Sequence, residues 1–221
     1  MIPPFFNPVP FLAELIYTVV ITAFCFLIFF KTKEIYDLTK HNGIKFFRYT
    51  FLFFGLSYAS RLLLHLFMLY NGIIFEMGIN RRAFLPLSNL IMAYFSTMAI
   101  LYLAFSTLWK RIKIRHLALY SNLFAVIIAF VGFFSRSPLF ISLIQLILLA
   151  LAIIVNAFAE KKSRKVSNMR ILYLMIAAFW LINLFLIDPH FRFHPAIKLV
   201  LQGFSIIVFI IIHFRLNKWL K

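Results

Sequence analysis

The main pattern along this chain is an alternation of long apolar segments with short segments that carry most of the charged residues. An apolar run of about 18 residues or more predicts a membrane-spanning helix, because about 20 residues at 1.5 Å each cross a hydrocarbon core of about 30 Å. We therefore predict an all-α, polytopic bundle of seven transmembrane helices. The predicted helices lie at approximately residues 11–30, 49–70, 83–109, 117–134, 138–159, 170–187 and 196–214.

The segments between these helices are short, and none is long enough to form a separate soluble domain. No stretch rich in Ser or Gly resembles a linker, so residues 1–221 are predicted to form a single integral membrane domain. Helix-forming residues continue after the first apolar segment as far as Asn42-Gly43, which we predict to be a C-cap pair. Prolines are expected in the first turns of four helices, where a missing N–H costs least; they are Pro10, Pro86, Pro138 and Pro195.

The composition agrees with a membrane protein. Hydrophobic residues make up 64% of the chain and charged residues only 13%, whereas soluble domains are about a quarter charged. A single cysteine, Cys25, excludes a disulfide or a cysteine metal site within one chain.

The net charge of +17 is distributed unevenly, and the distribution predicts an orientation. Seventeen of the 23 Lys and Arg residues fall in segments 31–48, 110–116 and 160–170 and in the C-terminal tail, and the alternate segments hold five. By the positive-inside rule the N-terminus is outside and the C-terminus cytoplasmic, which predicts a multi-pass protein of the cell membrane. The basic segments are expected to contact anionic lipid headgroups. They also leave open the hypothesis of a cytoplasmic protein partner. Nucleic acid is not an expected partner.

Polar side chains inside the apolar segments are the best indication of function, because they are costly in a bilayer and generally face the interior of a bundle. His65 follows Arg61 by four residues, so both lie on one helix face, and an antiparallel first helix brings Glu14 within reach of Arg61. Amide side chains occur at a similar depth in other helices. We predict an outward-opening polar pocket lined by Glu14, Arg61, His65, Asn89, Gln145, Asn183 and Gln202.

Such a pocket predicts recognition of a small polar or anionic molecule, for sensing or for transport, without a cofactor. Arg61 would bind the anionic group, His65 would respond to pH or donate a hydrogen bond, and Glu14 would hold Arg61 in place. A structural interpretation stays open, since interhelical hydrogen bonds also hold bundles together. A third hypothesis is a structural or assembly subunit of a membrane complex.

The segment DPHFRFHP, from Asp188 to Pro195, carries the remaining candidate chemistry. His190 and His194, with His65 or Asp188 as a third ligand, predict zinc as an alternative cofactor. This outline resembles in part the seven-helix zinc hydrolases of the alkaline ceramidase and adiponectin-receptor group, which implies a membrane metal-dependent hydrolase.

The match departs from that group's pattern in three ways. Arg61 stands where the group has serine, the third helix has no aspartate, and the His pair precedes the last helix. A loop that gates the pocket and a plain polar turn are the other interpretations of this segment, and we favour the turn. No Walker loop, glycine fingerprint, kinase motif or nucleophile elbow is present.

Overall fold

The chain folds into seven helices in the computed structural model, which describes residues 8–73, 81–109, 116–135, 138–160, 168–187 and 195–220. Each predicted apolar segment is a helix, so the predicted all-α fold is confirmed. The helices are α1 (Pro8–Thr39), α2 (Asn42–Ile73), α3 (Arg81–Leu108), α4 (Leu117–Ser135), α5 (Pro138–Glu160), α6 (Asn168–Ile187) and α7 (Pro195–Leu220).

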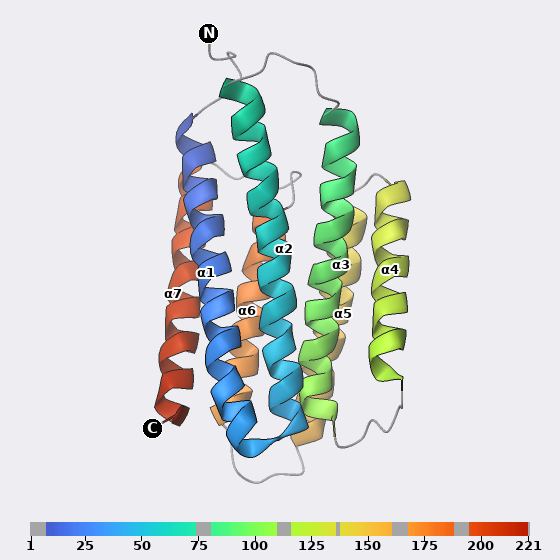
Figure 1. The fold of residues 1–221 in the computed structure, drawn as a ribbon, viewed down its shortest axis with the longest axis vertical. Coiled ribbons are helices and arrows are strands. Elements are labelled where there is room, and N and C mark those ends of the chain that lie inside the picture. The colour runs from blue at the N-terminus through green and yellow to red at the C-terminus, as the bar shows by residue number, and fades with distance from the viewer. Residues whose placement is uncertain are drawn as a thin grey trace.

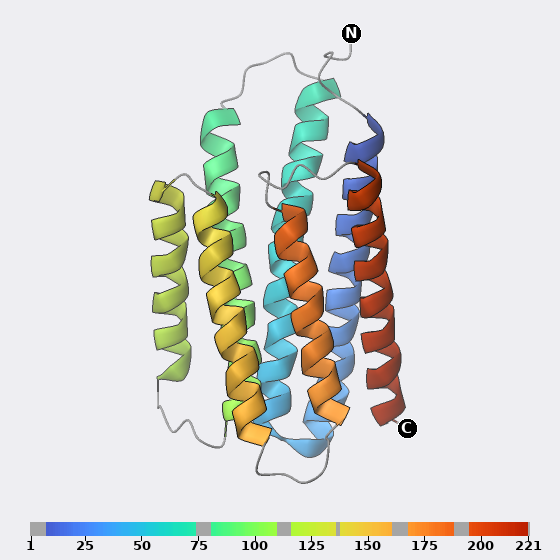
Figure 2. The ribbon, with the colours of Figure 1, turned by 180° about the vertical axis from the view of Figure 1, so that it is seen from behind.

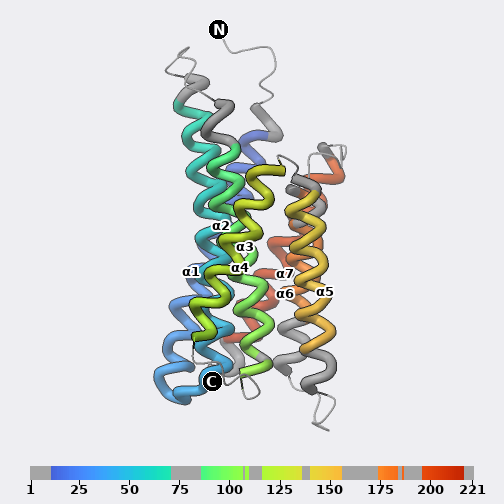
Figure 3. The backbone as a smooth tube through the Cα atoms, turned by 90° about the vertical axis from the view of Figure 1, so that its right-hand side faces the viewer, coloured from blue at the N-terminus to red at the C-terminus, as the bar shows by residue number. Residues whose placement is uncertain are grey.

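The helices run alternately up and down, so the two termini lie at opposite ends of the bundle (Figure 1). α1, α2 and α3 form one layer, with α6 behind α1 and α2, and α5 behind α3 (Figures 1 and 2). Seen from the side, α5, α6 and α7 form the second layer (Figure 3). α4 lies at the edge beside α3, and α7 returns to pack against α1, which closes a ring of consecutive helices.

Five of the seven helices are long and apolar enough to cross a membrane, which gives the bundle the character of an integral membrane protein. Their spans are Phe11–Thr39, Asn42–Tyr70, Pro86–Ser106, Leu117–Ser135 and Ala196–Leu216. The apolar stretches described in α5 and α6 are shorter, at Phe140–Val155 and Leu174–Asn183. Large apolar side chains such as Phe134 and Val200 are more than 70% exposed on the outside of the bundle. A soluble protein rarely exposes so much apolar surface.

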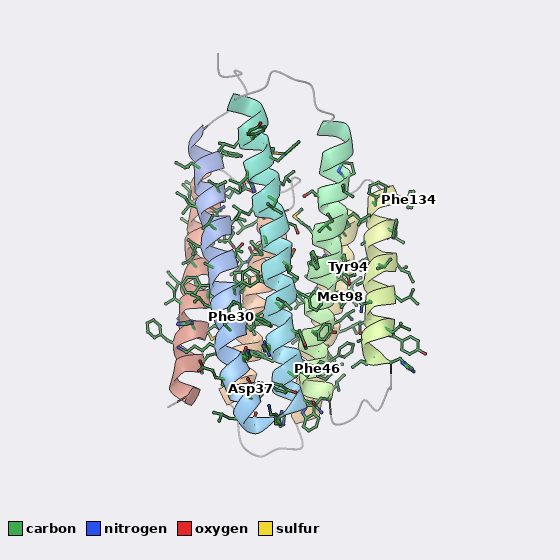
Figure 4. All side chains as sticks on the ribbon, in the orientation of Figure 1. Phe30, Asp37, Phe46, Tyr94, Met98 and Phe134 are labelled. Atoms are coloured by element: carbon green, nitrogen blue, oxygen red, sulfur yellow. The ribbon has the colours of Figure 1, made fainter. Side chains whose placement is uncertain are left out.

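The main core is built from aromatic rings where α2, α6 and α7 meet. The Phe54 ring lies 5.1 Å from Phe179, 4.4 Å from Trp180 and 6.2 Å from Phe209 between ring centroids. A smaller cluster joins α3 to its neighbours: Met98 and Tyr102 pack with Ala125 of α4, next to Phe46 and Tyr94 (Figure 4). The chain thus has aromatic contacts on both sides of α2.

The turn between α1 and α2 differs from the prediction. α1 ends at Thr39, and Lys40 has a φ of 49°, the left-handed conformation that commonly terminates a helix. The Lys40 N–H donates to the Tyr36 carbonyl oxygen at 2.7 Å. Asn42-Gly43 was therefore the wrong choice of C-cap; these residues begin α2, and Gly43 serves instead to let α2 approach α3.

Replacing Gly43 with alanine should lower the free energy of unfolding by about 1 to 3 kcal/mol, the usual cost of overpacking. A Cβ at this position would lie 2.9 Å from the Ser106 carbonyl oxygen and 2.9 Å from a Trp109 ring carbon. The matched control is Gly203→Ala in α7, where no atom lies within 4 Å of the added Cβ. Denaturation in detergent should show a loss for Gly43→Ala only; equal stability of the two variants would contradict the close packing.

The prolines confirm three predicted helix starts and correct a fourth. Pro10 lies in the first turn of α1, and Pro138 and Pro195 are the first residues of α5 and α7. α3 begins at Arg81, so Pro86 lies inside that helix. Proline inside a helix removes one backbone hydrogen bond, and its ring clashes with the carbonyl group four residues earlier.

Candidate functional site

A charged cluster lies in the half of the bundle that contains the N-terminus. It consists of Glu14 from α1, Arg61 and His65 from α2, and Lys198 from α7, and we call it the Glu14 cluster. Arg61 Nη2 donates to Glu14 Oε1, and Lys198 Nζ donates to Glu14 Oε2 at 2.8 Å. His65 Nε2 lies 3.5 Å from Glu14 Oε1. One carboxylate therefore joins three helices.

Burial makes these contacts stronger than surface ion pairs. The exposed side-chain fractions are 12% for Arg61, 18% for Glu14, 10% for His65 and 32% for Lys198. Away from water, the attraction between opposite charges is much less screened. Lys198 is the most exposed of the four.

The orientation of the His65 ring is fixed from two sides. His65 Nδ1 lies 2.8 Å from the Arg61 carbonyl oxygen. Since a carbonyl oxygen only accepts, Nδ1 carries the proton, and Nε2 faces Glu14. The Phe11 ring packs against the imidazole at 5.6 Å between centroids.

The cluster contains more positive than negative charge. Arg61 and Lys198 are both basic side chains, whereas Glu14 supplies the single carboxylate. In addition, Arg61 Nη1 is buried without a hydrogen-bond acceptor among the residues that the structure describes. Buried guanidinium donors normally have acceptors, so the cluster has an unmet preference for negative charge.

A second group of polar side chains lies one helical turn deeper, and we call it the polar layer. It consists of Tyr17 of α1, Tyr58 of α2, Asn183 of α6 and Ser205 of α7. Tyr17 donates to Asn183 Oδ1 at 2.5 Å, and Tyr58 donates to the same oxygen. Asn183 Nδ2 donates to Ser205 Oγ at 3.1 Å and to the Phe179 carbonyl oxygen at 2.8 Å. The layer thus links four helices below the Glu14 cluster.

Aromatic side chains follow directly below the polar layer. Phe54, Phe179 and Phe209 lie one turn below Tyr58, Asn183 and Ser205 respectively. A small cavity of about 10 Å³ lies among these rings and is lined mainly by apolar side chains. The cavity is about the size of one water molecule and offers few polar partners. It therefore does not continue the series of polar side chains that runs from the Glu14 cluster to the polar layer.

The structure brings together only some of the residues predicted to line one pocket. Glu14, Arg61 and His65 meet in the Glu14 cluster, and Asn183 lies in the adjacent polar layer. Gln145 belongs to a different interface, where its Nε2 donates to Ser96 Oγ of α3 at 2.5 Å.

The remaining two predicted residues lie on α7 and α3. Gln202 is buried, one turn inward from Lys198. Asn89 was predicted to face the interior, but its side chain is exposed. The neighbouring Ser88 is buried, so this turn of α3 is covered on one side, and Asn89 lies on its outward face.

The sequence prediction missed Lys198, Tyr17, Tyr58 and Ser205. Their spacing contained a usable signal. Tyr17 follows Glu14 by three residues and Tyr58 precedes Arg61 by three, so each shares a helix face with a charged residue. Lys198, Gln202 and Ser205 have the i, i+4, i+7 spacing of a single face of α7.

The zinc alternative remains a prediction. Of its four candidate ligands only His65 is described; Asp188, His190 and His194 lie outside the described residues, as does the loop or turn that they belong to. Within the described ranges no group of three His, Cys, Asp or Glu side chains is placed to hold a metal ion.

Comparison with known proteins gives one full-length relative. The chain is 34% identical over 224 residues to an uncharacterized protein of Archaeoglobus fulgidus, and the match covers 97% of this chain and 96% of that protein. No protein-family model and no solved structure matches the chain.

Proposed function

Because this chain belongs to the same protein family as the Archaeoglobus fulgidus protein, we propose one function for the whole bundle: binding of a small anionic molecule at the Glu14 cluster. The match covers nearly the full length of both chains, so the proposal concerns the membrane domain as a unit.

The observation that carries this proposal is the excess positive charge of a largely buried cluster. Two basic side chains share one carboxylate, and Arg61 Nη1 lacks an acceptor among the described residues. An incoming carboxylate or phosphate would supply both the missing charge and the missing acceptor, since guanidinium groups bind such anions through paired hydrogen bonds. The anion would compete with Glu14 for Arg61 and Lys198.

The ligand is proposed to enter from outside the cell. Among the described residues, the basic segment 31–48 and the last turns of α7 with Arg215 belong to the end of the bundle opposite the Glu14 cluster (Figure 1). By the positive-inside rule that end is cytoplasmic, which puts the N-terminus and the cluster in the outer half of the cell membrane.

Sensing is favoured over transport. The polar side chains continue from the Glu14 cluster to the polar layer, and there the rings of Phe54, Phe179 and Phe209 close the path. A bound anion would instead change the contacts between α1, α2 and α7 at Glu14. A sensor of this kind needs a cytoplasmic protein partner, for which the basic inner segments are the proposed contact surface.

Arg61→Gln should weaken binding of the anion about 10- to 100-fold, because a hydrogen bond to a charged group contributes about 1.5 to 3 kcal/mol. The bundle should stay folded, since Glu14 keeps Lys198 and His65 as partners. Native mass spectrometry of protein released from a mild detergent measures the bound species directly. Arg215→Gln, at the opposite end of the bundle, is the matched control.

We expect a small anionic adduct on the wild type and on Arg215→Gln that is lost from Arg61→Gln. An adduct that Arg61→Gln retains would contradict the proposed site. A zinc adduct that depends on His65 would contradict the proposed function and support the hydrolase alternative.

A further inference from the structure

A second cationic group lies near the opposite end of the bundle, where α1 and α2 pack together. The Arg48 guanidinium of α2 lies 4.2 Å from the centroid of the Phe29 ring of α1. Its Nε is buried and has no hydrogen-bond acceptor among the described residues. Arg48 is thus held in place by an aromatic face while a donor remains without a partner.

The two helices pack closely on one side of this contact. α1 and α2 come close at Gly55, where an added Cβ would lie 3.1 Å from the Cys25 Cβ. On the other side, toward the basic end, Lys33 lies one turn beyond Phe29 on α1, and its side chain is exposed.

Positive side chains outnumber negative ones around Arg48. Lys45 lies one turn before Arg48 on α2 and is half-buried. Of the two acidic residues in this part of α1, Asp37 is bonded to Lys40 at 3.3 Å, and Glu34 lies about 140° around the helix from Phe29. An anion is therefore the ligand that complements Arg48, Lys33 and Lys45.

An exposed apolar side chain follows Phe29 on α1. Phe30 is 62% exposed and lies in the lower half of that helix (Figure 4). Arg48 is six residues from the start of the apolar span Asn42–Tyr70, which is about 9 Å along the helix at 1.5 Å per residue. A cationic group at this position, next to an exposed apolar side chain, suits an amphipathic ligand better than a soluble anion.

We propose that Arg48, with Lys33 and Lys45, binds the phosphate group of an anionic membrane lipid whose apolar chains lie against Phe30. The guanidinium donates to the phosphate oxygens, and the two ammonium groups add charge at headgroup level. This site is separate from the Glu14 cluster and does not rest on the function proposed for that cluster.

Native mass spectrometry of the purified protein, titrated with phosphatidylglycerol and in parallel with inorganic phosphate, tests the site. Arg48→Gln should weaken binding of the first lipid about tenfold, because a charged hydrogen-bond donor is lost. The double variant Lys33→Gln/Lys45→Gln should also weaken it about tenfold, at about 1 kcal/mol per cation near the surface. Lys31→Gln, at the same end of α1 but on the side that faces α7, should change it less than twofold.

Comparing the two titrations distinguishes a site for a lipid phosphate group from a site for free inorganic phosphate. Lipid binding that is unchanged in both Arg48→Gln and the double lysine variant would overturn the proposal. Inorganic phosphate bound as tightly as the lipid, and lost in Arg48→Gln, would show a site for a soluble anion and would also overturn it. If Arg48→Gln does not fold, the double lysine variant decides, because Lys33 is exposed and Lys45 is only half-buried.

Discussion

Glu14→Gln should lower the free energy of unfolding by about 3 kcal/mol, the low end of the cost of breaking a buried ion pair. Glutamine cannot neutralise Arg61 and Lys198, which would then face each other as buried like charges. Three helices lose their common contact at once. Reversible denaturation in detergent micelles, followed by circular dichroism, measures the change.

A matched control is Glu34→Gln, which removes the same charge from the exposed side of α1 and should stay within about 0.5 kcal/mol of the wild type. The double variant Glu14→Gln/Arg61→Gln should recover part of the loss, because it also removes one of the two unpaired cations. If Glu14→Gln were as stable as Glu34→Gln, the Glu14 cluster would not hold the helices together.

Asn183→Leu should cost about 2 kcal/mol. Asn183 makes three interhelical hydrogen bonds, with Tyr17, Tyr58 and Ser205, and such bonds average about 0.6 kcal/mol each in membrane proteins. Leucine has a similar size but accepts none of the phenol protons. The same denaturation assay applies.

Asn122→Leu provides the comparison for this variant. The described structure gives Asn122 one interhelical hydrogen bond, from Tyr94 at 2.6 Å, so its loss should cost about 0.6 kcal/mol. Equal costs for the two variants would contradict a cooperative polar layer that links four helices.

The helices could be predicted from the sequence because their signal is local. A long apolar run has few alternatives to a spanning helix, since the bilayer leaves backbone groups no other partners. Arg61 and His65 were likewise identified by their spacing within one helix, and the antiparallel connection of α1 and α2 brought Glu14 to them. These inferences needed only the spacing of residues within one helix and the connection between two consecutive helices.

What the sequence did not predict depends on the relative heights of helices that are distant in sequence. Lys198 was not among the predicted pocket residues, because nothing local indicates that α7 packs beside α1 at the depth of Glu14. Asn89 was misplaced because the sequence does not show which face of α3 is covered by the other helices. Tyr17 and Tyr58 count as aromatic residues in an apolar run, and their hydroxyl groups matter only because Asn183 lies opposite them.

The proposed function predicts opposite effects on ligand binding for the loss of Glu14 and the loss of Arg61. Glu14 occupies the position that an anionic ligand would take, so its removal should strengthen ligand binding even though it weakens the fold. Loss of Arg61 should weaken binding while leaving Glu14 partnered. A purely structural ion pair gives no reason for these opposite effects.

The most direct test is the rise in unfolding temperature caused by succinate or inorganic phosphate at constant ionic strength. A ligand that binds only the folded protein stabilises it by about 2.7 kcal/mol at 100 times its Kd. We expect a rise for the wild type, a larger rise for Glu14→Gln and none for Arg61→Gln. The same rise in all three proteins, or none in the wild type, would contradict anion binding at the Glu14 cluster.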